Sequence, residues 1–170
     1  MISKKIFLIG MPGCGKSTAG KLLSNKLDYQ FFDLDDVIET STGKTIHELF
    51  KNSENDFRRI EQTELKKVIE LNTNVVIACG GGTPCFHDNM NDMLNAGTVV
   101  YLRTEIDVLE HRLKYESNRR PLLQSNSNLL QRLTELFEQR RVIYNKAQII
   151  IQCKTSSAET IADLIVNQLK

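Results

Sequence analysis

The chain has 170 residues, of which 41% are hydrophobic and 25% are charged. This length and composition are typical of one globular domain, here over residues 1–170, and exclude a disordered chain, a fibrous repeat or a small disulfide scaffold. The 22 lysines and arginines nearly balance the 21 acids, and the resulting net charge of +1 argues against a nucleic-acid-binding protein. We expect no signal peptide and no membrane segment, and the spacing of the four cysteines predicts free thiols in the cytoplasm.

Short apolar runs alternate with longer amphipathic segments along the chain. We expect strands at residues 6–9, 29–34, 75–78, 98–102 and 149–151. We expect helices after residue 18, from 45, over 54–71, after 104, over 129–144 and from Ser156. This alternation predicts an α/β fold, with a parallel sheet and helices on both of its faces.

A glycine-rich segment lies between the first expected strand and the first expected helix. Residues 10–17 read Gly-Met-Pro-Gly-Cys-Gly-Lys-Ser, which fits the phosphate-loop pattern G-x-x-x-x-G-K-S/T in its usual context. Glycines let backbone N–H groups face an anion, and the helix N-terminus adds partial positive charge. Lys16 is expected to reach the outer phosphates and Ser17 to offer its hydroxyl to Mg²⁺. The alternative is a glycine-rich turn without a ligand.

Three acids, Asp33, Asp35 and Asp36, follow the second expected strand. Residues i and i+2 of an extended chain point the same way, so we expect Asp33 and Asp35 to project together at the carboxyl edge of the sheet. A kinase needs one acid for the metal and one that orients or deprotonates the attacking hydroxyl, and we assign Asp33 and Asp35 to these roles in that order. Asp36 is interpreted as the cap or first turn of a helix, and a solvated capping segment is the alternative for all three.

Paired arginines occur at 58–59, 119–120 and 140–141. Each pair alone is a weak signal, because surface arginines are usually solvated or ion-paired. The run Gly80-Gly81-Gly82 follows an expected buried strand and indicates close approach to a ligand, with a plain tight turn as the alternative.

Together these segments resemble the shikimate kinase family of P-loop kinases over nearly the full chain. The resemblance rests on GMPGCGKST (10–18), FDLDD (32–36), FRRIE (57–61), GGG (80–82), RRPLL (119–123) and RRVIY (140–144). It implies a three-layer sandwich of the P-loop NTPase type, with a five-stranded parallel sheet in the strand order 2-3-1-4-5. It also implies transfer of the ATP γ-phosphate to the 3-hydroxyl of shikimate. The flat net charge favours a monomer.

The resemblance further implies roles for individual residues. The ATP-binding set is Gly13, Cys14, Gly15, Lys16, Ser17, Thr18, Arg120 and Lys154. The substrate-binding set is Asp35, Arg58, Gly80, Gly81, Gly82 and Arg140. Asp35, Lys16 and Arg120 are the implied catalytic residues, and Ser17 and Asp33 the implied Mg²⁺ site. Residues 35–59 would form the substrate-binding region and 117–127 a lid.

Two rival functions remain open from the sequence. Another small P-loop kinase could phosphorylate a nucleoside monophosphate or a different hydroxy acid, because arginines hold phosphate as readily as carboxylate. The acids of 33–36 together with the three glycines favour a small polyol acid. A non-catalytic nucleotide-binding module is the second rival, in which Asp35 is only a helix cap.

Overall fold

A computed structural model describes residues 4–114, 128–154 and 156–170. Its five strands form one sheet in the order β2-β3-β1-β4-β5, and every neighbouring pair is parallel. The strands are β1 (Lys5–Ile9), β2 (Gln30–Asp33), β3 (Val75–Ala78), β4 (Thr98–Arg103) and β5 (Ile149–Gln152). The expected fold class and strand order are therefore confirmed.

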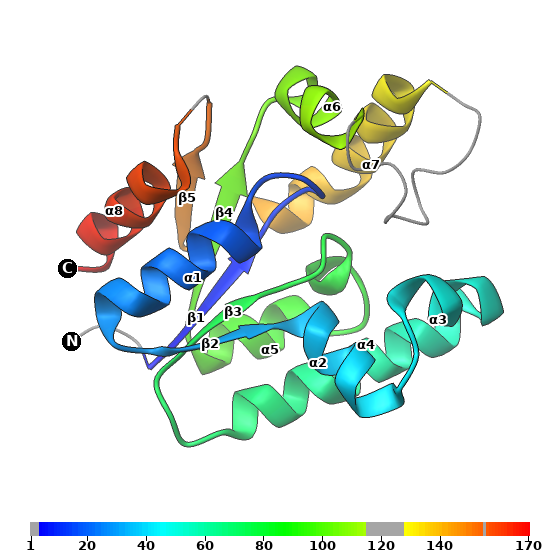
Figure 1. Ribbon diagram of the computed structural model, residues 1–170, viewed down its shortest axis with the longest axis horizontal. Coiled ribbons are helices and arrows are strands. Elements are labelled where there is room, and N and C mark those ends of the chain that lie inside the picture. The colour runs from blue at the N-terminus through cyan, green and yellow to red at the C-terminus, as the bar shows by residue number, and fades with distance from the viewer. Residues whose placement is uncertain (1–3, 115–127, 155) are drawn as a thin grey trace.

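Helices connect the strands and cover both faces of the sheet. They are α1 (Lys16–Leu27), α2 (Leu34–Thr42), α3 (Ile46–Asn52), α4 (Glu54–Glu70), the 3₁₀ turn η1 (Thr83–Cys85), α5 (Asn89–Ala96), α6 (Ile106–Lys114), α7 (Leu129–Tyr144) and α8 (Ala158–Leu169). Helices α1 and α8 lie on one face, with α4 and α5 on the other (Figure 1). Among the described helices, none combines the length and apolar character needed to cross a bilayer.

The core is centred on β1, the middle strand of the sheet. All four residues of its run Ile6–Ile9 are fully buried. Because helices cover both faces of the sheet, neither side of this strand can be polar, which explains its unbroken apolar sequence. Strand β4 is buried in the same way from Val99 to Leu102. The polar residues that remain for chemistry therefore lie outside these two strands, in the loops and helices around the sheet.

Two helix starts beyond β2 are fixed by side-chain caps. Thr45 and Glu48 form the capping box expected from the sequence, and hydrogen bonds from Thr45 hold the pKa of the Glu48 carboxyl below its usual range. Ser53 caps α4, where its hydroxyl accepts from the backbone N–H of Asp56 at 3.2 Å. This cap fixes where α4 begins, and α4 carries Arg58.

The second strand is shorter than predicted. It ends at Asp33, and α2 begins at Leu34. The Asp33 side chain caps this helix by accepting from the backbone N–H of Asp35 at 3.1 Å. The extended-chain argument that placed Asp33 and Asp35 on one side was therefore wrong, because the chain is helical between them. Asp36 lies in the first turn of α2, as one of its two interpretations required.

Two other details differ from the sequence prediction. The cap of the last helix is Ser157, whose hydroxyl accepts from the N–H of Thr160, and not Ser156. Helix α5 was not expected; half of its sequence NMNDMLNA is Asn or Asp, which favour turns over helices. Its buried Met90 and Met93, three residues apart, hold it against the sheet.

Candidate active site

The phosphate loop joins β1 to α1 at the carboxyl edge of the sheet. Gly13 and Gly15 adopt left-handed φ angles of 79° and 94°, which side-chain-bearing residues rarely adopt. The Lys16 ammonium donates to the carbonyls of Gly10 at 3.0 Å and Met11 at 3.1 Å, so it lies folded across the loop. A cation thus lies against a glycine-rich loop at a helix N-terminus, a combination that suits an anionic phosphate.

The neighbours of the loop include one residue outside the predicted set. Arg112, from α6, donates to the Gly13 carbonyl at 3.2 Å. These two residues are 99 positions apart and the acceptor is a backbone atom, so the sequence carries no signal for this contact. Cys14 is buried, with Sγ 3.6 Å from the Lys16 ammonium, whereas Thr18 is exposed. Arg112 therefore adds positive charge beside the predicted phosphate cradle.

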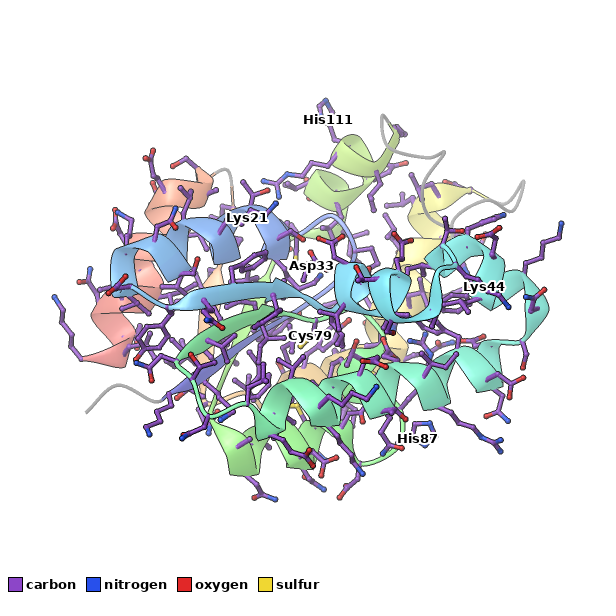
Figure 2. The ribbon with its side chains drawn as sticks, turned by 60° about the horizontal axis from the view of Figure 1, so that its bottom comes forward. Lys21, Asp33, Lys44, Cys79, His87 and His111 are labelled. Atoms are coloured by element: carbon purple, nitrogen blue, oxygen red, sulfur yellow. The ribbon has the colours of Figure 1, made fainter. Side chains whose placement is uncertain are left out.

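The predicted metal site brings together two oxygen donors. The Ser17 hydroxyl donates to Asp33 Oδ2 at 2.5 Å, from the first turn of α1 to the end of β2. Figure 2 shows Asp33 at this junction. A hydroxyl and a carboxylate suit a hard cation such as Mg²⁺, which keeps water among its ligands. Among the described residues, no group of three or more His, Cys, Asp or Glu side chains could hold a metal ion.

The Gly80-Gly81-Gly82 turn follows β3 and is surrounded by charged groups. A methyl group added to Gly80 would lie 3.1 Å from Glu61 Oε1 and 3.3 Å from Asp35 Oδ1. These carboxylates come from α4 and α2, on separate segments of the chain. Asp33 thus faces Ser17 while Asp35 faces the glycine turn, which fits two acids with separate functions.

Both predicted substrate arginines also reach this turn. A methyl group on Gly82 would lie 2.5 Å from Arg58 Nη2, and one on Gly81 would lie 3.1 Å from Arg140 Nη1. The same position on Gly81 lies 3.0 Å from Cδ of Pro12, in the phosphate loop. The glycines are therefore needed for space, and Arg58, Arg140 and the phosphate loop all meet at one short segment.

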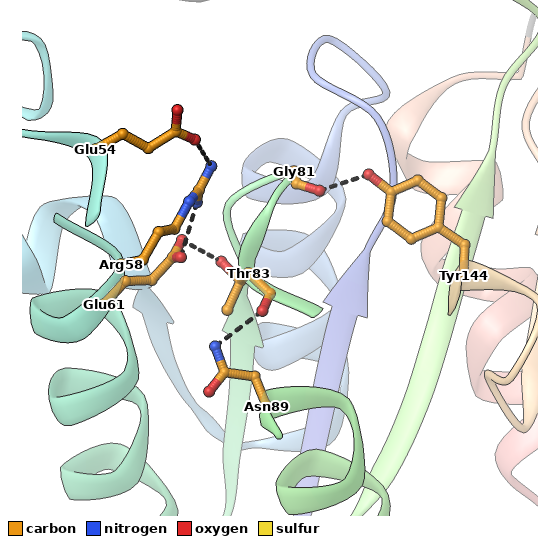
Figure 3. A network of polar contacts seen from close by, with 7 residues as sticks. All are labelled: Glu54, Arg58, Glu61, Gly81, Thr83, Asn89 and Tyr144. Atoms are coloured by element: carbon orange, nitrogen blue, oxygen red, sulfur yellow. Dashed lines mark hydrogen bonds and ion pairs between the residues drawn. The ribbon is translucent and has the colours of Figure 1, made fainter. Parts of the chain in front are cut away.

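Arg58 is buried and held by two acids of its own helix (Figure 3). Its Nη1 donates to Glu61 at 2.8 Å, and its Nη2 to Glu54 at 3.3 Å. Its guanidinium carbon lies 4.0 Å from the ring centre of Phe86, and two further aromatic rings, Phe50 and Phe57, lie at 5.1 Å. These contacts fix the guanidinium before any ligand arrives.

A chain of hydrogen bonds ties Glu61 to the glycine turn and to α5. The Thr83 hydroxyl donates to Glu61 at 2.6 Å, and the Asn89 side-chain amide donates to the Thr83 carbonyl at 2.9 Å (Figure 3). All three side chains are buried. The sequence analysis assigned no role to these residues, although Glu61 stood in the quoted FRRIE motif, three positions after Arg58 and hence on the same helix face.

Arg140 lies on α7 and is 5% exposed. Its Nη1 has no hydrogen-bond partner among the described residues. A buried charged donor left unpaired is costly, so this atom marks a place where an anionic ligand fits. Arg59 and Arg141, the second members of their pairs, are both exposed. The structure therefore separates a buried arginine from an exposed one in each of these two pairs.

Two members of the predicted ATP site remain, Lys154 and Arg120. Lys154 is exposed, in a bend after β5, and follows the buried Cys153 in the sequence. Arg120 and the predicted lid at 117–127 lie outside the described residues.

Comparison with known proteins identifies the family. The family model for shikimate kinase matches residues 12–170. The shikimate kinase of Azobacteroides pseudotrichonymphae is 40% identical over 167 residues, which cover 96% of each chain. The crystal structure of shikimate kinase from Bacteroides thetaiotaomicron is 38% identical, with a TM-score of 0.90 and 97% of each chain covered.

A third relative carries a ligand in its solved structure. Shikimate kinase from Acinetobacter baumannii, solved in complex with shikimate, is 33% identical to this chain. The two structures superimpose with a TM-score of 0.92 over 97% of this chain and 92% of the relative. The chain thus belongs to the shikimate kinase family and is a kinase that transfers phosphate from ATP to shikimate.

Proposed function

We propose that this transfer goes from the ATP γ-phosphate to the 3-hydroxyl of shikimate, between the phosphate loop and the turn at residues 80–82. The observation that carries the proposal is the convergence of Asp35, Arg58 and Arg140 on a turn that also lies beside Pro12 of the phosphate loop. Phosphoryl transfer needs little covalent chemistry from the protein and depends on holding both reactants in line. A turn in contact with both halves of the site supports that function.

The acid half of the site binds the substrate carboxylate and hydroxyls. Arg140, with an unpaired buried nitrogen, and Arg58, with a guanidinium already oriented, would pair with the carboxylate. Gly80, Gly81 and Gly82 would place their backbone against the ring of the substrate. Asp35, half-buried beside Gly80, would accept the hydrogen bond or the proton of the attacking hydroxyl. In this proposal residues 35–59 form the substrate-binding region.

The phosphate half of the site binds ATP. Backbone N–H groups of residues 13–18 would face the phosphates, and the Lys16 ammonium would exchange its two loop carbonyls for phosphate oxygens. Mg²⁺ would be held by Ser17 and, through water, by Asp33, and when bound would neutralise phosphate charge. Arg120, from a lid at 117–127, would add positive charge to the transferring group, and Lys154 would contact the nucleotide.

The oligomeric state and the cellular location of the enzyme can also be inferred. We infer a monomer in the cytoplasm. The flat net charge supports a monomer, and a reducing compartment is supported because all four cysteines, each within the described residues, are free thiols.

Replacing Asp35 by Asn tests the role of its carboxylate, and Asp36→Asn is the matched control. Asp36 has the same chemistry one position later, but its side chain is exposed. We expect Asp35→Asn to lower kcat by roughly 10²–10⁴-fold with little change in ATP affinity, and Asp36→Asn to leave both unchanged. The assay couples ADP release to shikimate, with quinate, AMP and gluconate as control acceptors. Unchanged turnover in Asp35→Asn would remove this residue from the mechanism.

A further inference from the structure

Each carbonyl of the glycine turn is held by a hydrogen bond. The backbone N–H groups of Thr83 and Cys85 hold the first and third carbonyls of residues 80–82, at 3.1 and 2.8 Å. The middle carbonyl, that of Gly81, accepts from the Tyr144 hydroxyl at 2.5 Å (Figure 3). A side chain from α7 thus supplies the one contact to these three carbonyls that does not come from the backbone of η1.

This contact fixes more than one oxygen atom. The Gly81 carbonyl and the Gly82 N–H belong to one planar peptide group, so holding the first sets the direction of the second. Glycines have no side chain to restrict their backbone, and the turn would otherwise sample many conformations. The Tyr144 hydroxyl therefore selects the orientation of the peptide that lies between Arg58 and Arg140.

Tyr144 is itself rigidly placed. Its side chain is fully buried, and its ring packs against that of Tyr101 with centroids 5.0 Å apart. Its hydroxyl also lies 3.9 Å from the sulfur of Met11, in the phosphate loop. Burial raises the pKa of the Tyr144 phenol well above its usual range, so the hydroxyl remains a donor at neutral pH. Arg140 precedes it by one helical turn, and both reach Gly81.

We propose that Tyr144 is a positioning residue for the acid substrate, which acts by orienting the Gly81–Gly82 peptide and not by touching the substrate. The inference rests on the proposed substrate site at this turn. It predicts that the Tyr144 hydroxyl contributes to shikimate binding and leaves ATP binding unaffected.

The test compares two substitutions that each remove one buried hydroxyl. Tyr144→Phe deletes the donor to Gly81. Tyr101→Phe is the matched control, because its ring is the stacking partner but its hydroxyl has no partner among the described residues. Steady-state kinetics are measured for both substrates well below the lower Tm. We expect Tyr144→Phe to raise the KM for shikimate about tenfold with the KM for ATP unchanged, and Tyr101→Phe to change neither.

Amide hydrogen exchange gives a second measurement that does not depend on turnover. We expect the amides of residues 81–83 to exchange faster in Tyr144→Phe than in Tyr101→Phe. An unchanged shikimate KM in Tyr144→Phe, an equal rise in the KM for ATP, an equal rise in Tyr101→Phe, or unchanged exchange at residues 81–83 would overturn the inference. A wild-type enzyme without shikimate turnover would instead defeat the proposed function.

Discussion

The contribution of the buried Arg58–Glu61 ion pair to stability can be compared with that of a more exposed ion pair made by the same arginine. Arg58 contacts both Glu61 and Glu54, but the Glu61 side chain is 1% exposed and that of Glu54 is 49% exposed. Glu61→Gln and Glu54→Gln therefore each remove one negative charge that faces Arg58. The substitution and the partner are the same in both variants, and only the burial of the glutamate differs.

The two variants are expected to differ strongly in stability. Without the Glu61 charge, a buried guanidinium retains only a half-exposed partner, and breaking a buried pair costs about 3 kcal/mol. The Thr83 hydroxyl can turn to accept from the new amide, so packing is preserved and the loss reflects charge. Removing Glu54 should cost less than about 1 kcal/mol, because water already screens that contact.

Urea denaturation at neutral pH measures the free energy of unfolding of each variant. For a chain of this length, about 3 kcal/mol corresponds to a fall in Tm of roughly 6–12 °C. The shikimate KM should rise in Glu61→Gln as Arg58 loses its fixed orientation. Similar and small losses of stability in both variants would refute the reasoning, since burial would then not isolate the Arg58–Glu61 pair from water.

Further predictions concern the glycine turn, the metal site and a thiol. Gly82→Ala would place a methyl group 2.5 Å from Arg58 Nη2, so we expect at least a tenfold rise in the shikimate KM by steady-state kinetics with the ATP KM unchanged. Asp33→Asn retains an oxygen that caps α2 but loses its charge, so a titration of activity with Mg²⁺ should require more metal while Tm stays constant. Partial burial raises the pKa of the Cys85 thiol. Its alkylation at pH 7.5, followed by mass spectrometry, should therefore be slower than that of a fully exposed thiol in a small peptide.

The sequence predicted those parts of the fold whose signals are local. The runs 6–9 and 75–78 lie in strands because an unbroken apolar segment of that length fits a sheet covered on both faces. The run 149–151 also lies in a strand, although Ile150 in it is exposed. The capping box at Thr45 and Glu48 was visible because its two partners are three residues apart. The strand order did not come from any such pattern, because it depends on contacts between distant segments and was supplied by the family resemblance.

The sequence predicted the charged residues of the site. It did not predict the residues whose hydrogen bonds hold them in place. Asp35, Arg58 and Arg140 stand out as residue types, and the structure brings all three to the glycine turn. The Tyr144 contact spans 63 positions and ends on a backbone carbonyl, an acceptor that every residue possesses. Thr83 reaches the Glu61 carboxylate across 22 positions, a separation at which the sequence carries no pairing signal. Such supporting contacts become visible only when the fold is known.

The position of Gly81 has a thermodynamic consequence for the two substrates. A methyl group on its α-carbon would lie 3.0 Å from Pro12 Cδ on the ATP side and 3.1 Å from Arg140 Nη1 on the acid side. A ligand that shifted either neighbour would change the space left for the other, and would link the two binding equilibria through this one peptide. Linkage is reciprocal, and the factor by which ATP alters the affinity for shikimate must equal the factor by which shikimate alters the affinity for ATP.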